Sequence, residues 1–407
     1  MSDTELDHII EDSDIKLDHQ DTEDSSDSED SDDNDIHHEM DEEDDDEMEE
    51  LANDMPEELK DLISDVITGN NIHLEEDAPP VQKKLSELTL EGIANYIKKE
   101  SPKICFMVGA GISTSAGIPD FRTPGTGLYD NLGKYKLDDP QDIFDLSCFD
   151  EDPRPFYTLA KELFPAGAKP TTCHYFIKLV DEKGLLKRCF TQNIDSLETI
   201  ANIPSSKVVF AHGNHLTSSC RICKRKYDNA WLQERLSDTN PDNIVPLCEG
   251  KGCVGVVKPD IVFFGENLPT NFFLGAIHDI PTCDLLIIMG TSLVVHPFAS
   301  IIHEVKPHVP RLLINMTAVG KKKSPYSPSL MYDEPDNIRD VFWPGTCDDG
   351  AMELARLLGW ETELKELIDK EHARLEELEN KSRIGKATSN VHHCSMDGDS
   401  VAGPSKQ

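Results

Sequence analysis

Short runs of apolar residues recur along the middle of this chain, and they constrain its fold more than any other feature. The runs occupy residues 104–108, 208–211, 261–264, 285–289 and 312–314. An apolar run of this length, without polar alternation, is typical of a parallel strand that is buried on both faces. Segments with a helix-like pattern lie between several of the runs, at 155–164, 173–182 and 297–305. Strands that alternate with helices predict an α/β fold with an open parallel sheet and helices on both faces.

The negative charge of the chain is concentrated at its N-terminus. The 407 residues include 78 acidic residues and 39 lysines and arginines, so the net charge is -39. Residues 1–50 contain 26 of the acidic residues and one lysine, which gives this segment a charge of -25 and leaves -14 for the remainder. Because nucleic-acid binding needs clustered lysine and arginine, an acidic body predicts no direct, sequence-specific nucleic-acid partner.

Both ends of the chain are predicted to be disordered, with a globular part between them. Residues 1–56 form an acidic tail that cannot bury enough apolar surface to offset its chain entropy. We expect a linker with a short helix at 57–84. A globular domain, large enough to be a catalytic domain, is predicted at 85–381, and its last helix at 354–378. The polar segment 382–407 is predicted to be a second disordered tail.

Two features near the N-terminus each allow two interpretations. A group of serines surrounded by acidic residues is either a target for an acid-directed kinase or part of a solubilising tail, and it comprises Ser25, Ser26, Ser28 and Ser31. A short amphipathic helix pattern is either a helix that docks on the core or a nuclear-export signal, and it comprises Leu59, Leu62, Ile63, Val66 and Ile67.

The chain shows no signal for a membrane or for secretion. It has no stretch of about 18 uninterrupted apolar residues, which a membrane span requires. Its N-terminus is acidic and lacks the basic start and apolar run of a secretory signal. We therefore expect no membrane partner and a location in the cytoplasm, the nucleus or both, where the eleven cysteines are better explained by metal binding and buried thiols than by disulfides.

Four of the cysteines have the spacing of a metal site. Two residues separate Cys220 from Cys223, and four residues separate Cys248 from Cys253. The wider spacing of the second pair is feasible because its loop contains Gly250 and Gly252. Two thiolate pairs at this separation suit one tetrahedral, structural Zn²⁺ without an open position. The alternative is four unrelated thiols. The spacing predicts a small zinc-binding module at about 215–258, inserted in the larger domain.

A glycine turn follows the first apolar run. Gly109, Ala110 and Gly111 lead into a helix-like segment, so backbone N–H groups there can approach a phosphate group. Thr114 occupies the third glycine position of the usual dinucleotide fingerprint, and a purely structural turn explains this segment equally well. The run at 117–122, which reads GIPDFR, places a carboxylate, an aromatic ring and a cation directly after it.

These motifs, taken together, resemble the sirtuin family. The matching segments are 109–122, 191–195, 212–213, 258–266 and 290–292, and they read GAGISTSAGIPDFR, TQNID, HG, KPDIVFFGE and GTS. They occur in the family's order and span about residues 85–360. The segment 121–132 is most similar to class I, especially its mainly cytosolic branch that acts on tubulin and histones. The acidic N-terminus is instead similar to the larger nuclear branch.

The resemblance implies a Rossmann-like sheet that binds NAD⁺ as a co-substrate, with one structural Zn²⁺ in a four-cysteine ribbon. It also implies an NAD-dependent protein lysine deacetylase or deacylase. Such an enzyme transfers the acyl group from lysine to ADP-ribose and releases nicotinamide and O-acyl-ADP-ribose. The implied partners are proteins with acylated lysines, such as histones, tubulin or other acetylated proteins.

The resemblance also assigns residues to the NAD site. The first group lies in and after the glycine turn and comprises Gly109, Ala110, Gly111, Ile112, Ser113, Thr114, Ile118, Asp120, Phe121 and Arg122. The second group lies further along the chain and comprises Gln192, Asn193, Ile194, Asp195, His212, Gly290, Thr291, Ser292, Asn315, Met316, Thr317 and Cys347. Thr317 departs from the acidic residue that is usual at this position, and a buried structural role explains Cys347 equally well. Asp195 could instead be a helix N-cap.

His212 is the candidate general base, with Asn193 as a second catalytic residue that positions ribose or water. A histidine suits this role because its unperturbed pKa lies near neutrality. His212 ends an apolar run and precedes Gly213, as the family's catalytic histidine does. The segment 214–216 departs from the family pattern, and His215 is a competing candidate for the base.

The resemblance predicts that an added strand of substrate pairs with the segment 262–266. This segment comprises Val262, Phe263, Phe264, Gly265 and Glu266, and the first two would flank an apolar tunnel for the acylated lysine. A buried strand followed by a turn is the structural alternative.

Three other functions remain open at this stage. A mono-ADP-ribosyltransferase would use the same pocket. A dehydrogenase fits less well because GIPDFR is not the continuation of its phosphate loop. An NAD-sensing scaffold, whose acidic tail recruits basic partners, would not need His212, Asn193 and Asp195.

Overall fold

The computed structural model describes residues 82–393, apart from Pro124 and the segments 133–138, 164–166, 238–239, 241–242 and 322–328. The predicted acidic tail, the predicted helix around Leu59–Ile67 and residues 394–407 therefore lie outside the described residues. Residues 382–393, for which we expected disorder, continue the last helix to His393.

Six strands form the central sheet, in the order β3-β2-β1-β7-β8-β9, and every pairing between neighbours is parallel. Their bounds are β1 Ile104–Val108, β2 Leu186–Thr191, β3 Val208–Phe210, β7 Leu285–Met289, β8 Arg311–Asn315 and β9 Asp340–Pro344. The predicted open parallel sheet is confirmed. Because β2 and β7 flank β1 on opposite sides, the strand order reverses there, and open α/β sheets bind ligands at such a point, beyond the carboxyl ends of the strands.

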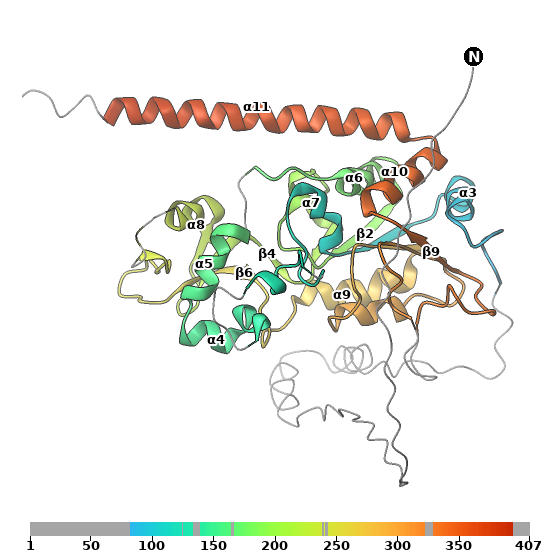
Figure 1. Cartoon of the computed structure of the whole chain (residues 1–407), viewed down its shortest axis with the longest axis horizontal. Coiled ribbons are helices and arrows are strands. Elements are labelled where there is room, and N and C mark those ends of the chain that lie inside the picture. The colour runs from blue at the N-terminus through green and yellow to red at the C-terminus, as the bar shows by residue number, and fades with distance from the viewer. Residues whose placement is uncertain are drawn as a thin grey trace, which may run out of the picture. The chain divides into compact units, whose positions relative to one another are not determined.

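Helices cover both faces of this sheet, as Figure 1 shows for α6 and α10 on one side and α9 on the other. Alternate residues of β1 enter two cores: Phe106 packs with the cluster that includes α6 and α10, and Met107 with the cluster that includes α9. The α-helices are α3 Leu90–Glu100, α4 Leu146–Glu151, α5 Arg154–Leu163, α6 Thr172–Glu182, α7 Leu197–Ile200, α8 Asn229–Leu236, α9 Thr270–His278, α10 Cys347–Leu358 and α11 Glu361–His393. The 3₁₀ helices are η1 Ala110–Ile112, η2 Thr114–Ala116, η3 Tyr129–Asn131, η5 Pro140–Phe144, η6 Ser205–Lys207, η8 Ile280–Thr282 and η9 Phe298–His303.

A smaller, antiparallel sheet has the order β5-β4-β6 and belongs to a second layer of structure. Its strands are β4 Gly213–Cys220, β5 Lys226–Asp228 and β6 Val257–Ile261. The helices α4 and α5 share an aromatic core with α8 and the end of β6. This part of the molecule is therefore larger than the predicted module at 215–258, because a second segment of the chain, which ends at Leu163, packs against it.

Three sequence-based expectations about elements are wrong. The apolar run at 261–264 is not a strand of the central sheet, since Ile261 ends the antiparallel strand β6 and Phe263 packs into the aromatic core. The segment 297–305 is helical only from Phe298 to His303, and this stretch is the 3₁₀ helix η9 rather than an α-helix. The predicted helix at 354–378 is two helices, because Gly359 adopts a left-handed conformation that ends α10.

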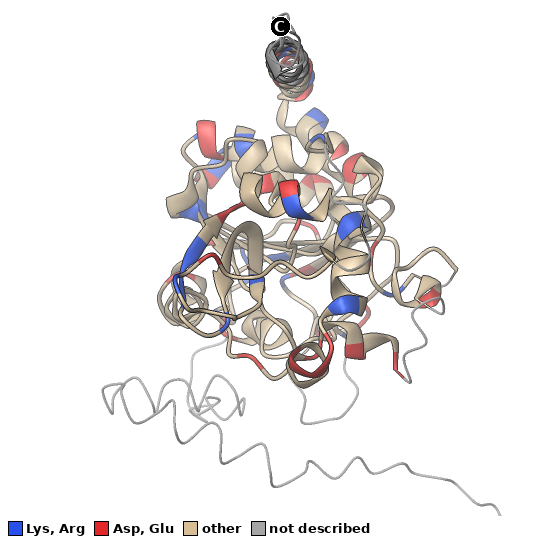
Figure 2. Ribbon diagram, turned by 90° about the vertical axis from the view of Figure 1, so that its left-hand side faces the viewer, with Lys and Arg blue, Asp and Glu red and all other residues tan. Residues whose placement is uncertain are grey.

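Charged residues of both signs are interspersed over the described ribbon in Figure 2, on the side that faces the viewer. None of the described helices combines the length and apolar character that crossing a membrane requires.

A buried ion pair joins the first residues of β8 and β9. Arg311 and Asp340 are each 1% exposed, and the guanidinium donates two hydrogen bonds to the carboxylate, at 2.7 Å and 2.6 Å. The remaining donors of Arg311 reach the carbonyls of Ile302 and Ser329. This pair joins β8 to β9 at their first residues, and both of its charged side chains are shielded from water.

We expect Arg311→Met to destabilise the protein by about 3–5 kcal/mol, because it removes both buried hydrogen bonds from Arg311 to the Asp340 carboxylate and leaves the more distant Arg339, at 3.8 Å, as the neighbouring cation. Urea unfolding of the purified chain measures this change. The control is Arg356→Ala, which breaks an exposed pair with Glu353 and should cost less than about 1 kcal/mol. Equal costs for the two variants would contradict the assignment, and a variant with both Arg311→Met and Asp340→Leu should recover part of the lost stability.

Candidate functional site

The glycine turn after β1 packs directly against the turn after β7. The N–H of Gly111 donates to the carbonyl of Gly290 at 2.8 Å. A Cβ on Gly111 would lie 2.7 Å from the Cα of Gly290, and one on Gly290 would lie 2.6 Å from the N of Ile112. Only glycines allow this approach, and Gly290 also has a positive φ of 62°. The two turns therefore meet at the carboxyl edge of the sheet, where its order reverses.

A buried chain of hydrogen bonds links this turn to the end of β2. Ser113 donates to the carboxylate of Asp195 at 2.7 Å, and the side-chain amide of Asn193 donates to Ser113 at 3.2 Å. Asp195 also accepts from the N–H of Leu197, so it caps α7 as well as holding Ser113. The Oδ1 of Asn193 is buried and has no hydrogen-bond partner within the described residues. Such an unpaired acceptor is typical of a site that a polar ligand completes.

Gln192 connects three parts of the site. Its N–H donates to the carbonyl of Val108, and its side-chain oxygen accepts from Thr291 at 2.7 Å. Its carbonyl lies 3.1 Å from Nδ1 of His212. Together with Ser113 of the glycine turn, Gln192, His212 and Thr291 bring residues from four of the predicted motifs to one place in the structure.

The contact with Gln192 fixes the tautomer of His212. A carbonyl can only accept, so Nδ1 carries the proton and Nε2 is left as an acceptor. Burial lowers the pKa of His212 below its ordinary value; the bond to the Gln192 carbonyl opposes this shift, and the positive charge of Arg122 adds to it. The imidazole is therefore neutral at pH 7, which is the form that a general base requires.

His215, the competing candidate, contacts a different carbonyl from the one that His212 contacts. Its Nδ1 contacts the carbonyl of Ile194 at 2.6 Å, and its side chain is 9% exposed. Burial lowers its pKa as well. Its position in β4 makes it part of the link between the two sheets.

The run GIPDFR forms a tight turn beside the glycine loop. The carboxylate of Asp120 accepts from the N–H groups of Arg122 and Thr123, so it holds the turn rather than facing outward. Phe121 packs against Tyr129, and the guanidinium of Arg122 lies over the same tyrosine ring. Ile118 is half-buried in this turn, and Thr114 donates to the carbonyl of Gly111.

The residues predicted for the adenosine side lie at the ends of β7 and β8. Ser292 is exposed, and the side chain of Asn315 donates to the carbonyl of Thr317 at 2.9 Å. Met316 is 68% exposed. Cys347 is buried at the start of α10, where its thiol contacts the carbonyl of Ile314 at 3.7 Å.

The predicted substrate segment is anchored to its surroundings at several points. The N–H of Val262 donates to the carbonyl of His212 at 2.9 Å. Phe263 is buried in the aromatic core, whereas Phe264 is exposed and its backbone pairs with the segment that precedes α4. Gly265 has a positive φ of 80°. Glu266 accepts from Lys258 at 2.6 Å and from the N–H of Phe263 at 2.9 Å, so its carboxylate braces the turn.

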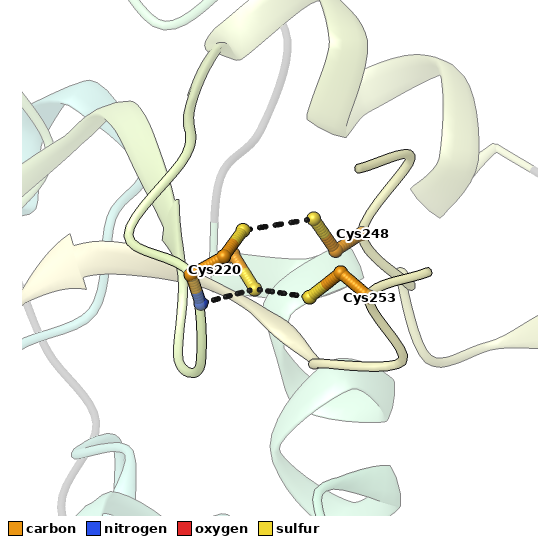
Figure 3. A group of neighbouring side chains, drawn as sticks. Cys220, Cys248 and Cys253 are labelled. Atoms are coloured by element: carbon orange, nitrogen blue, oxygen red, sulfur yellow. Dashed lines mark hydrogen bonds between the residues drawn. The ribbon is translucent and has the colours of Figure 1, made fainter. Parts of the chain in front are cut away.

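The four predicted metal ligands form one cluster. Their sulfur atoms lie within 4.8 Å of one another, and Figure 3 shows Cys220, Cys248 and Cys253 pointing toward a common centre. The Sγ atoms of Cys220 and Cys253 are 3.6 Å apart, and those of Cys223 and Cys248 are 3.5 Å apart. A tetrahedral Zn²⁺ with Zn–S bonds of about 2.3 Å requires sulfur separations of roughly 3.8 Å, so the cluster fits.

Neighbouring donors favour the thiolate form that zinc requires at two of the four ligands, Cys220 and Cys248. The hydroxyl of Tyr227 donates to Cys248 at 3.1 Å and lowers the pKa of that thiol to about 6. The N–H groups of Cys223 and Gly250 donate to the sulfurs of Cys220 and Cys248. Four protein ligands leave no open position, so the site is structural.

Sequence reasoning missed several residues that the structure places around the site. Thr171 donates to the carbonyl of Ile112 at 2.7 Å, and Asp348 accepts from Ser115 at 2.6 Å. His174 and Glu198 are fully buried beside Asp195. The available signal was the position of Asp348 and Thr171 at helix N-termini, where polar side chains are expected to bond to nearby backbone.

Comparisons with known proteins agree with this arrangement. A family model described as the Sir2 family matches residues 109–297. NAD-dependent protein deacetylase sirtuin-2 of Danio rerio is 47% identical over 317 residues, which cover 76% of this chain and 82% of that protein. NAD-dependent deacetylase sir2A of Dictyostelium discoideum is 50% identical over 295 residues, which cover 72% of this chain and 56% of that protein. NAD-dependent protein deacetylase hst2 of Schizosaccharomyces pombe is 43% identical over 281 residues, 69% of this chain and 79% of that protein.

The sheet with its reversal at β1, the glycine turn, the neutral histidine and the four-cysteine cluster agree with the family that the sequence motifs resemble. With the identity and coverage of these relatives, they place the chain in the Sir2 family, the sirtuins.

Proposed function

We propose that this protein is an NAD-dependent protein lysine deacetylase. The observation that carries the proposal is His212, whose ring is kept neutral by burial and whose tautomer is set by the carbonyl of Gln192. The chain belongs to the Sir2 family, and its curated relatives are named NAD-dependent deacetylases. The substrates are acetylated proteins, and the acyl group passes to ADP-ribose as nicotinamide is released.

We assign the NAD site to the carboxyl edge of the sheet, at the point where its strand order reverses. The glycine turn would present N–H groups to the phosphates, and Ser113, Asn193 and Asp195 would surround the nicotinamide and its ribose. The unpaired Oδ1 of Asn193 supports this assignment, because a bound polar group would satisfy it. Thr291 and Asn315 lie where the adenosine half would reach. NAD, when bound, supplies an activated glycosidic bond whose cleavage drives the reaction.

The roles of the surrounding residues follow from their positions. His212 would accept a proton at Nε2 from a ribose hydroxyl, since its Nδ1 proton is held by Gln192. Phe121, which is fixed against Tyr129, would shield the ribose from water. Arg122 would place its positive charge near a phosphate or the ribose, a role that suits its fixed donor geometry.

Substrate backbone would bind along the segment 262–266. In the part of the chain that the structure describes, no hydrogen bond engages the carbonyl of Val262 or the N–H of Gly265. These two groups would pair with an added strand of substrate. Because Phe263 is buried in the aromatic core, we propose that Val262 and Phe264, rather than Phe263, contact the substrate through their side chains.

Histones and tubulin are the substrates that we propose first, on the similarity of the segment 121–132 to the corresponding branch of class I. We propose the cytoplasm or the nucleus as the location. None of the described cysteines forms a disulfide, which agrees with a reducing compartment.

Incubation of an acetyl-lysine peptide with the protein and NAD should yield free lysine, nicotinamide and O-acetyl-ADP-ribose, measured by mass spectrometry. His212→Ala should reduce kcat by about 10²–10⁴-fold, because it removes the general base. The matched control is the exposed histidine of α9, as His278→Ala, which should retain full activity. Peptide that gained ADP-ribose would indicate a transferase, and equal activity of the two variants would exclude His212 as the base.

The pH profile of kcat/KM should show an acidic limb below the ordinary histidine pKa of about 6.5, because burial lowers the pKa of His212. Arg122→Gln should move this limb to higher pH, since it removes a positive charge that disfavours the imidazolium. The shift is read from the shape of the profile after normalisation, so weaker NAD binding does not obscure it. A limb that is unchanged in Arg122→Gln would show that another group titrates.

Cys220→Ser should abolish zinc binding and lower the thermal unfolding temperature, because the site needs all four thiolates. Zinc is measured by elemental analysis, and the expected content of the unaltered protein is one ion per chain. Cys148→Ser, at an exposed thiol in α4, is the control and should retain its zinc. Full zinc content in Cys220→Ser would remove this residue from the metal site.

A further inference from the structure

One buried lysine contacts residues at both ends of the segment 262–266. Lys258 of β6 is 5% exposed, and its ammonium group donates to the carbonyl of Ile261 at 2.7 Å and to the carboxylate of Glu266 at 2.6 Å. The same nitrogen lies 4.1 Å from the centre of the Phe263 ring. Lysine is almost never buried to this extent unless it is paired, so its place here calls for a role.

The contacts of Lys258 hold the segment as a turn. Its two acceptors stand on either side of residues 262–265, so one ammonium group sets the separation of the Ile261 carbonyl and the Glu266 carboxylate. The same carboxylate oxygen of Glu266 accepts from the N–H of Phe263 at 2.9 Å, and the N–H of Glu266 donates to the carbonyl of Phe263 at 3.0 Å. The conformation of the turn therefore depends on the Lys258–Glu266 pair.

The turn carries the backbone groups that we assign to substrate. The carbonyl of Val262 and the N–H of Gly265, which no hydrogen bond engages in the described part of the chain, lie between the two ends that Lys258 holds. The segment borders a cavity of about 500 Å³, whose lining includes Val262, Gly265 and Glu266. Strand addition needs N–H and C=O groups at a set spacing, and a backbone that is already ordered loses less entropy when the added strand binds.

Stability alone is a weak explanation for this ion pair. A buried salt bridge adds little net stability, because the desolvation of both charges offsets their attraction. Glu266 also faces Arg221 at 3.7 Å, and Arg221 is itself paired with Asp150 at 2.6 Å. The Lys258–Glu266 pair is better explained by the single backbone conformation that it specifies.

We propose that Lys258 is a positioning residue for substrate: through the Ile261 carbonyl and Glu266, it holds the segment 262–266 in the shape that pairs with the substrate backbone. The inference rests on the proposed function, which assigns substrate to this segment. Lys258 acts through the turn and touches neither the acetylated lysine nor NAD. Its loss should therefore weaken the binding of an acetylated peptide and leave the binding of NAD unchanged.

The first test is Lys258→Met, which keeps the length of the side chain and removes the ammonium group. We expect the Kd for a fluorescently labelled acetyl-lysine peptide, measured by anisotropy on the full chain, to rise by about tenfold, as for the loss of one main-chain hydrogen bond. The Kd for NAD, measured by calorimetry, should stay within about twofold, because Lys258 does not contact that site.

The matched control is Lys226→Ala, which breaks another lysine–carboxylate pair of the same small sheet. Lys226 of β5 is 70% exposed and lies 3.1 Å from Asp260. Because an exposed pair contributes little, the peptide Kd should be unchanged. A role of Lys258 in stability alone would lower the unfolding temperature of Lys258→Met and leave the peptide Kd of the folded variant unchanged, which would overturn the proposal. An equal rise in the Kd for NAD would overturn it too.

Glu266 provides a second test with a conservative substitution. Glu266→Gln keeps an oxygen that accepts from Lys258 and from the N–H of Phe263, whereas Glu266→Ala removes it. We expect the peptide Kd to rise by less than about threefold in Glu266→Gln and by about tenfold in Glu266→Ala. Equal losses in the two variants would contradict the proposal. If Lys258→Met does not fold, this comparison decides the question.

A double variant shows whether the two residues act together. Adding Lys258→Met to Glu266→Ala should raise the peptide Kd by less than about twofold further, because both changes break one contact. Independent, fully multiplied effects would overturn the proposal.

These readouts also distinguish the inference from the proposed function. Peptide affinity is measured without turnover, so a protein that binds the acetylated peptide but does not deacetylate it would refute only the proposed function. A protein with full deacetylase activity, whose peptide affinity does not respond to Lys258→Met or Glu266→Ala, would refute only the inference.

Discussion

The close approach of two backbone turns, one after β1 and one after β7, is the constraint on which the site depends. The hydrogen bond from Gly111 to Gly290 brings the ends of two central strands to a distance that no side chain would permit. Each residue of the site is then placed relative to this contact: Ser113 follows the first turn, and Thr291 follows the second and binds Gln192 at the end of β2. A parallel sheet positions its carboxyl ends together, and the glycines allow the loops there to interlock.

Much of the fold could be predicted from the apolar runs, because strands buried on both faces need apolar residues at every position. The edge strand β9 could not, since it begins with Asp340, whose buried charge is paired with Arg311 of β8 in the folded chain. Hydropathy cannot detect a buried ion pair between residues far apart in sequence. The run at 261–264 was wrongly predicted to be a strand of the central sheet. Phe263 is apolar for a different reason, because it packs among the rings of the aromatic core.

The motifs in the sequence predicted the residues that meet at the crevice, and the spacing of the cysteines predicted their cluster. They did not predict the buried polar side chains that lie beside Asp195. A histidine and a glutamate on helices usually face solvent, and His174 and Glu198 are buried only because α6 and α7 are covered by other parts of the chain. The tautomer of His212 could not be predicted from the sequence either, because it depends on the backbone carbonyl of Gln192, twenty residues earlier in the chain.

The backbone bond from Val262 to His212 joins the base to the segment that we assign to substrate. In the roles that we propose, the same residue would take part in chemistry through its side chain and in substrate alignment through its main chain. A peptide that displaces the segment 262–266 would act on His212 directly, through the backbone bond from Val262. Sequence preferences among substrates should accordingly be expressed in turnover as much as in affinity, so a poor substrate can bind well and still react slowly.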